Sequence, residues 1–198
     1  MMLSGTTTFV DMYYFEDEVA RACVETGMRG YLGETLISQP TCDSPVPGDG
    51  LKIARAMFEN WKGEELVRPI AAPHGTTTCD ETLLRAASEL AAEKNAVFTL
   101  HASEMDYEMK AFAERGETPT SYLKKIGALN PRLLAAHCIH LSDADIELMK
   151  ESGAAVAHCI GSNTKAAKGV APIAALAKAG VRYGLGTDGP SSGNTLSM

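Results

Sequence analysis

The chain has 198 residues, a formal net charge of −7 and a charged-residue content of 22%. This length suits one buried domain, and the composition is typical of a soluble globular protein. The acidic balance argues against a nucleic-acid partner, and no apolar run reaches the roughly 18 residues that a membrane span needs. The N-terminus has no basic region followed by an apolar core, so no secretory signal is indicated and we expect a cytoplasmic protein.

Short apolar runs alternate with helical stretches along the whole chain. The predicted strands cover residues 6–12, 29–36, 67–74, 96–101, 133–139, 154–160 and 183–187. The predicted helices cover residues 16–26, 49–61, 80–94, 107–115, 120–129, 142–152 and 172–179. Repeated strand–helix order predicts a parallel α/β sheet with helical crossovers.

A doubly wound open sheet and a barrel both satisfy this order. No GxGxxG motif follows the first strand, which disfavours a dinucleotide-binding open sheet. The longest irregular segment, residues 37–50, contains three prolines and is predicted to be a surface loop. No linker or domain boundary is visible, so we expect residues 1–198 to form a single domain.

The five cysteines predict free thiols. An odd count without a CxxC pair fits neither a disulfide framework nor a cysteine zinc site. We expect small buried side chains in a reducing compartment. A cysteine nucleophile at Cys138 is conceivable, but its position on a predicted strand, next to His137, points it into the protein wall.

Metal-binding and proton-transferring residues gather at the ends of predicted strands. His74, His101 and His137 end or closely follow strands, Asp188 follows the last strand, and Glu104 comes three residues after His101. In a parallel barrel, these strand ends converge on one rim, where active sites form. Any one of them alone could be structural: a hydrogen-bonded histidine, a turn aspartate or a solvated helix start. Their shared position is what indicates a site.

The residue types fit metal-assisted hydrolysis. Imidazole and carboxylate side chains predict a zinc, iron or manganese site. Further titratable groups beside the metal can act as acid and base toward an activated water. A Ser-His-Asp mechanism is not supported, because there is no GxSxG elbow.

Four motifs in order carry a resemblance to a known family: HASE (101–104), AAHCIHL (135–141), SNTKAAKG (162–169) and GLGTDG (184–189). The chain resembles the amidohydrolase superfamily, and within it the methylthioadenosine/S-adenosylhomocysteine deaminase and chlorohydrolase-like group. The resemblance implies an incomplete (β/α)₈ TIM-type barrel that covers strands two to eight. Strand one, which carries the family's HxH metal-ligand motif, and the last helix would be missing.

The resemblance also implies a role for each residue. His101 and Asp188 would be metal ligands for a divalent ion, zinc in the first place, with iron or manganese as alternatives. Glu104, His137 and Asp188 would be catalytic: Asp188 as general base, Glu104 as proton donor to a ring nitrogen, and His137 as the group that stabilises the developing charge. His74, Glu104 and His137 would contact the substrate.

The implied function is hydrolytic deamination of an adenosine-type nucleoside, a small-molecule substrate, by attack of a metal-activated water on the amino-bearing ring carbon. The alternatives are another amidohydrolase reaction, of the guanine deaminase or s-triazine chlorohydrolase type, and a non-catalytic barrel domain that binds a nucleoside or a partner. Because only two of four expected metal ligands are present, we expect the chain alone to bind metal weakly and to show little turnover. Homo-oligomer formation is a further possibility that the resemblance leaves open.

Overall fold

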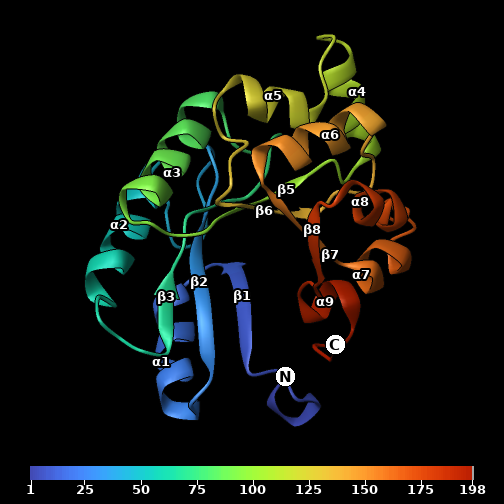
Figure 1. Ribbon diagram of the computed structural model, residues 1–198. Helices are drawn as coiled ribbons and strands as arrows, with labels where there is room; N and C mark the ends of the chain where they lie inside the picture. The colour runs from blue at the N-terminus through green and yellow to red at the C-terminus, as the bar shows by residue number, and fades with distance from the viewer. Residues whose placement is uncertain (198) are drawn as a thin grey trace. The chain divides into compact units, whose positions relative to one another are not determined.

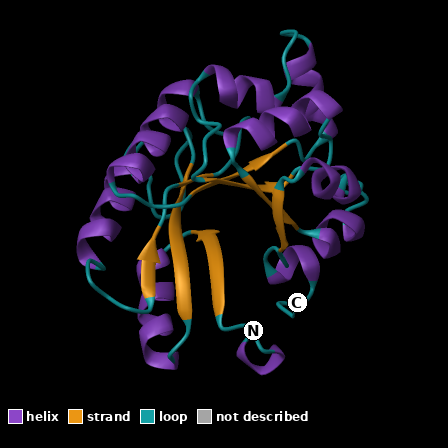
Figure 2. Cartoon of the chain, viewed as in Figure 1, coloured by secondary structure: helices purple, strands orange, loops and turns teal. Residues whose placement is uncertain are grey.

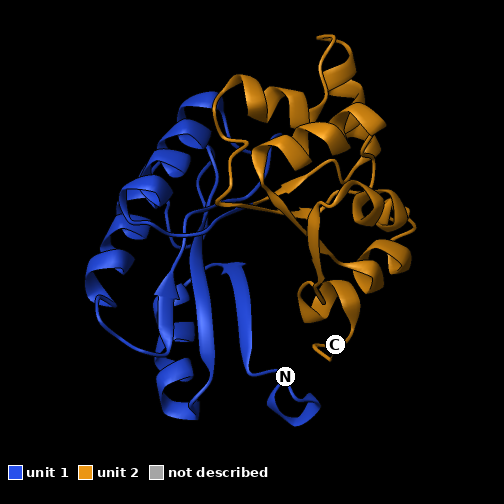
Figure 3. Ribbon diagram, viewed as in Figure 1, with its two compact units in different colours: residues 1–99 blue, residues 100–198 orange. Residues whose placement is uncertain are grey.

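The computed structural model describes residues 1–197 and divides into two compact units, Met1–Thr99 and Leu100–Met198, of which Met198 lies outside the described residues (Figure 3). Strands alternate with helices along both units (Figures 1 and 2). The predicted α/β class is therefore confirmed. No helix in the described part of the chain is long and apolar enough to cross a membrane.

The first unit is built around a central strand. Its strands are β1 (Thr8–Tyr13), β2 (Arg29–Leu36), β3 (Val67–Pro69) and β4 (Ala72–Pro73). Its helices are η1 (Met2–Ser4), α1 (Glu16–Thr26), α2 (Gly50–Asn60) and α3 (Glu81–Glu93). Strand β2 pairs in parallel with β1 on one side, and it also pairs in parallel with both β3 and β4.

The single strand predicted over residues 67–74 is wrong, because the structure breaks it into β3 and β4. Pro69 and Pro73 carry no N–H group and cannot donate to a sheet ladder, which shortens regular pairing on both sides of the break. The chain nevertheless stays beside β2, since the N–H of Ile70 donates to the carbonyl of Leu32 at 2.9 Å.

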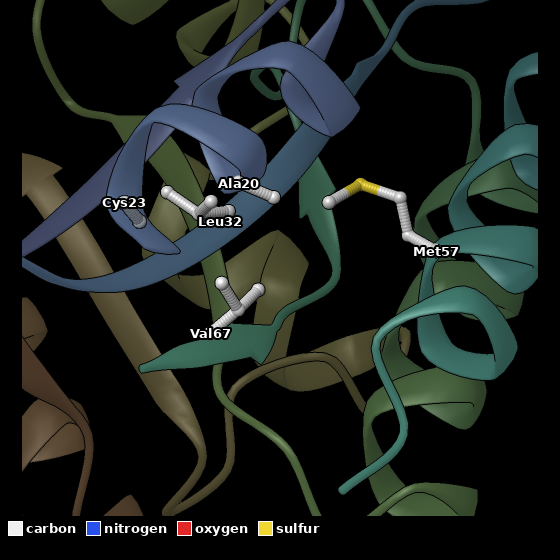
Figure 4. Close-up of a cluster of buried hydrophobic side chains, with 5 residues drawn as sticks. All are labelled: Ala20, Cys23, Leu32, Met57 and Val67. Carbon is white, nitrogen blue, oxygen red and sulfur yellow. The ribbon is translucent and has the colours of Figure 1, made fainter. Parts of the chain in front are cut away.

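Buried apolar side chains from α1, α2, β2 and β3 form the core of the first unit. Figure 4 shows this cluster, which consists of Ala20, Cys23, Leu32, Met57 and Val67. Local signals mark the end of one helix and the start of another in this unit. Gly27 ends α1 with a φ of 76°, and the Asp80 carboxylate caps α3 by accepting the N–H of Leu83 at 2.9 Å.

The second unit contains one sheet in the order β5-β6-β7-β8. Its strands are β5 (Phe98–Ala102), which starts in the last two residues of the first unit, β6 (Leu133–His137), β7 (Ala155–His158) and β8 (Arg182–Leu185). Its helices are α4 (Asp106–Ala113), α5 (Pro119–Lys125), α6 (Asp143–Ser152), α7 (Ile160–Lys165), α8 (Ile173–Ala179) and α9 (Pro190–Gly193). Strands β6, β7 and β8 pair in parallel, so their carboxyl ends lie at one edge of the sheet.

The strand predicted over residues 154–160 is too long. It ends at His158, and Ile160 begins the short helix α7, which the sequence did not predict. A helix of six residues is too short to show an amphipathic repeat, and no side-chain cap marks its start at Cys159. Two residues of α7, Ser162 and Asn163, nevertheless bond residues of the candidate site.

Candidate active site

Chemically active side chains follow the strand ends of the second unit. His101 is the fourth residue of β5, His137 ends β6, and Asp188 follows β8 after two residues of loop. Because β6, β7 and β8 are parallel neighbours, His137 and Asp188 are carried to the same edge of the sheet. The contacts described below join His101, Glu104 and His137, and electrostatic interactions link Asp188 to both histidines.

The two histidines of this cluster lie against each other. The rings of His101 and His137 stack with their centroids 5.2 Å apart and their planes 22° from parallel. Nδ1 of His137 lies 2.8 Å from Oδ1 of Asn163, an acceptor, to which the tautomer with its proton on Nδ1 donates. Nε2 of His137 then faces Oε1 of Glu104 at 3.5 Å. The buried imidazole of His137 is thus fixed on both sides.

Backbone hydrogen bonds to Glu108 fix the position of Glu104 in the loop after β5. Its N–H donates to the carboxylate of Glu108 at 2.8 Å, and the N–H of Ser103 donates to the same carboxylate at 3.1 Å. The Glu104 side chain is only 15% exposed and accepts a hydrogen bond from Lys168.

Nearby positive charge governs the ionisation of Glu104. Burial is the largest single influence and raises its pKa, but His137, Lys168 and His101 together outweigh burial and hold the pKa below its ordinary value. Glu104 is therefore an ionised carboxylate at neutral pH in this arrangement.

Asp188 is also held as a carboxylate. Ser162 Oγ donates to its Oδ2 at 2.6 Å, and the N–H of Gly189 donates to its Oδ1 at 2.6 Å. Burial is the largest influence and raises its pKa, whereas these two hydrogen bonds and the charges of His137 and His101 lower it, with a net lowering. The same two histidines therefore act electrostatically on both Glu104 and Asp188.

The backbone around the cluster adopts unusual conformations. Ser103, His137, Cys138 and Asp188 are not glycines, yet their φ angles are 52°, 69°, 50° and 59°. Side chains with a Cβ rarely occupy this left-handed region, and each such residue costs on the order of 1–3 kcal/mol unless its surroundings impose it. Concentration of these conformations at three strand ends is typical of functional sites.

His74 lies in the first unit, directly after β4. Its Nδ1 is 2.8 Å from Oγ1 of Thr78. This contact does not test the predicted role of His74 in holding a substrate, which stays a prediction. The roles predicted for His101, Glu104, His137 and Asp188 stay predictions as well.

The cysteine alternative loses support. Cys138 is buried, and burial raises the pKa of its thiol far above the ordinary range. Burial also raises the pKa of Cys159 to about 11. Neither thiol supplies a thiolate near neutral pH, which a nucleophile requires. All five cysteines are free.

Three residues of the SNTKAAKG motif contact the cluster, although the sequence analysis assigned them no role. They are Ser162, Asn163 and Lys168. The motif was the one signal in the sequence that pointed to these residues. Their hydrogen-bond partners are 26 to 64 residues away in the chain, so no local pattern predicts the contacts. His158 ends β7, as its place near the end of a predicted strand indicates, but it was assigned no role; its buried Nδ1 has no hydrogen-bond partner among the described residues, and burial lowers its pKa.

The side chains of the cluster include donor types that bind divalent metals. His101 and Asp188 offer an imidazole nitrogen and an ionised carboxylate, which are ligand types that zinc accepts. Within residues 1–197, however, no three His, Cys, Asp or Glu side chains are grouped so that they could hold a metal. The two residues thus fit a divalent metal in their chemistry, and a complete coordination shell would need further donors.

Comparison with known proteins decides the family. The sequence matches the amidohydrolase family over residues 1–198. This chain belongs to the amidohydrolase family. A 5-methylthioadenosine/S-adenosylhomocysteine deaminase from Thermodesulfovibrio yellowstonii is 39% identical over 199 residues, covering 100% of this chain and 45% of the relative. The chain therefore spans about half the length of the curated relatives that it matches.

Solved structures agree with this assignment. An adenosine deaminase from Xanthomonas campestris with bound zinc superimposes with a TM-score of 0.95 at 32% identity, covering 100% of this amidohydrolase chain and 45% of that one. An atrazine chlorohydrolase from Arthrobacter aurescens, complexed with zinc, superimposes with a TM-score of 0.89 at 23% identity, covering 100% and 48%, and shows the fold alone. The fold is accordingly that of the (β/α)₈ barrel, of which this chain matches a part.

Proposed function

We propose that this amidohydrolase is a metal-dependent hydrolytic deaminase of adenosine-type nucleosides such as methylthioadenosine or S-adenosylhomocysteine. The observation that carries the proposal is the pair of carboxylates, Glu104 and Asp188. His101 and His137 lower the pKa of both. Hydrolytic deamination needs one group that takes a proton from water and another that gives a proton to the ring. The activity named for the 39% identical relative supports the same reaction.

His101 and Asp188 would hold the metal, and zinc is the first candidate because the Xanthomonas structure contains it. When bound, a divalent metal lowers the pKa of water and makes it a nucleophile near neutral pH. A four-coordinate zinc site needs donors beyond these two side chains. We therefore expect the 198-residue chain alone to bind zinc weakly and to turn over little substrate.

Two carboxylates divide the proton transfers. Asp188 accepts a proton from the attacking water, and its bonds to Ser162 and Gly189 fix the direction of its oxygens. Glu104, which is ionised in the free site, must first take up a proton; it then gives that proton to the ring nitrogen next to the amino-bearing carbon, which makes that carbon more open to attack. Asp188 passes the proton taken from water to the amino group, which leaves as ammonia, and Glu104 takes back the proton of the new hydroxyl group, which leaves a ring carbonyl.

His137 and His74 each have a proposed role toward the substrate. His137 is held by its hydrogen bond to Asn163, and its ring stabilises the charge that develops on the reacting purine. His74 helps to hold the nucleoside. The free cysteines suit a reducing compartment, and the cytoplasm is where we propose that the protein acts.

A chimera tests the proposal directly. This chain would replace the aligned region of the Thermodesulfovibrio relative, which supplies the remainder of its own sequence. We expect zinc-dependent ammonia release from methylthioadenosine, S-adenosylhomocysteine or adenosine, and a loss of about 10²–10⁴-fold in the Glu104→Gln variant.

Guanine and atrazine serve as competing substrates in the same assay. If the chimera converts guanine or atrazine but no adenosine-type nucleoside, the proposed substrate class is wrong and the converted compound indicates the correct one. A chimera that folds and binds zinc but converts none of these compounds would favour a domain that only binds its ligand.

A further inference from the structure

One short segment contacts three members of the candidate site. Within residues 162–168, Ser162 donates to Asp188 at 2.6 Å, Asn163 bonds His137 at 2.8 Å, and Lys168 donates to Glu104. We call residues 162–168 the positioning segment. It begins in α7 and ends in the turn that follows.

The positioning segment is firmly fixed. Ser162 and Asn163 are buried, at 1% and 0% exposure. The N–H of Lys168 donates to the carbonyl of Asn163 at 2.9 Å, which closes the turn. The next residue, Gly169, has a φ of 118°, and a Cβ there would lie 2.8 Å from Ile139. Lys168 is therefore carried on a turn that a backbone hydrogen bond closes and that lies against Ile139.

Lys168 and His137 meet the same oxygen of Glu104. The Lys168 ammonium donates to Oε1, and Nε2 of His137 is 3.5 Å from that atom. The Lys168 side chain is 21% exposed and that of Glu104 is 15% exposed, so the pair is largely screened from water. Charge-assisted hydrogen bonds in such surroundings are stronger and better oriented than ion pairs in open solvent.

Lys165 offers a contrast within the same segment. Its ammonium donates to the carbonyl of Ser191 at 2.9 Å and to Oδ1 of Asn194 at 2.7 Å. Lys165 thus binds the C-terminal segment, whereas Lys168 binds Glu104. The two lysines form a matched pair for experiment.

We propose that Lys168 is a positioning residue for Glu104: its ammonium holds the carboxylate beside His137 and favours the ionised form. Lys168 thereby sets the pH below which Glu104 carries the proton that the reaction needs. This last consequence rests on the proposed function, whereas the effect on Glu104 itself does not.

The other groups around Glu104 come from several elements. His101 of β5 and His137 of β6 lower its pKa together with Lys168, and burial raises it. Glu108 of α4 accepts the backbone N–H of Glu104. None of these groups changes when Lys168 is substituted, so the contribution of the ammonium can be isolated.

The test is a pH titration of the Glu104 carboxyl carbon by NMR on the full 198-residue chain, without metal or substrate. The signal is assigned by its disappearance in Glu104→Gln. We expect the titration midpoint to move upward in Lys168→Met and in Lys168→Gln. It should stay close to the wild-type value in Lys168→Arg, which keeps the charge, and in Lys165→Met.

An unchanged midpoint in both neutral Lys168 variants would overturn the proposal, as would an equal upward shift in Lys165→Met. Amide spectra that match the wild type away from the site show that each variant is folded. Because this titration needs no turnover, it stands even if the chimera shows no deaminase activity. If the chimera is active, Lys168→Met should also move the pH profile of kcat upward.

Discussion

The ring of His101 stacks on the ring of His137 with a centroid separation of 5.2 Å. The two residues are nevertheless assigned different roles, His101 as a metal ligand and His137 as a group that contacts the substrate. In the chimera, we expect His101→Asn to weaken zinc affinity by more than the roughly 10–100-fold that partners outside the coordination shell contribute. His137→Asn should leave zinc affinity nearly unchanged and lower kcat. Equilibrium dialysis with zinc measures the first effect, and equal losses of affinity in both variants would contradict the assignment.

Buried carboxylates in the first unit predict that stability falls as the pH rises. Glu16 is fully buried, and neither of its carboxylate oxygens has a hydrogen-bond partner in the described residues. Burial, followed by the negative charges of Asp11 and Glu34, raises the pKa of Glu16 to about 9. Burial, followed by a hydrogen bond that protonated Glu34 donates to the Asp43 carboxylate, also raises the pKa of Glu34 to about 8.

The sign of the effect follows from proton binding. Between its ordinary pKa of 4.5 and its folded pKa of about 9, Glu16 binds more protons in the folded than in the unfolded state. The stabilisation is complete below 4.5 and is lost as the pH rises toward 9. Urea unfolding at a series of pH values should show this decline in wild type and a flatter profile in Glu16→Gln. Glu18→Gln, at an exposed position of the same helix, should follow wild type, and identical profiles for all three proteins would refute the prediction.

Gly33 of β2 is expected to tolerate no side chain. A Cβ at this position would lie 2.4 Å from Cβ of Ala72 and 2.8 Å from Cγ1 of Ile70. Overpacking of this kind costs about 1–3 kcal/mol, so Gly33→Ala should lower the free energy of unfolding by that amount. Gly184→Ala in β8 meets no heavy atom within 4 Å and should change stability little. Denaturant midpoints compare the two variants, and a neutral Gly33→Ala would show that the strands can move apart at low cost.

Asp145 of α6 is predicted to be the strongest capping residue of the second unit. Its buried carboxylate accepts hydrogen bonds from Thr118 Oγ1, from the N–H of Ser142 at 3.0 Å and from Ser142 Oγ at 2.6 Å. Asp145→Ala leaves these donors without their charged acceptor and should cost about 1.5–3 kcal/mol. Asp143→Ala, at an exposed position in the same helical turn, should cost less than about 1 kcal/mol. Thermal unfolding monitored by circular dichroism measures both, and equal destabilisation would contradict the proposed network.

The sequence by itself determined the α/β class and the positions of the site residues at strand ends. Alternating apolar strands and amphipathic helices are local patterns, so β2 and α1 were predicted with the bounds that the structure shows. Parallel strands then require residues such as His137 and Asp188 to lie at the same edge of the sheet, which is a rule of topology and needs no coordinates.

Only the tertiary structure decided how those residues are held. Lys168 and Glu104 are 64 positions apart, and no local pattern predicts that they bond. The left-handed conformations of His137 and Asp188 are imposed by surrounding contacts against the preference of their own side chains. Helix α7 was taken for the end of a strand because its six residues are too few for a helical repeat, yet its packing places Ser162 and Asn163 against the site. Local sequence governs which element forms, whereas long-range packing governs which side chains meet.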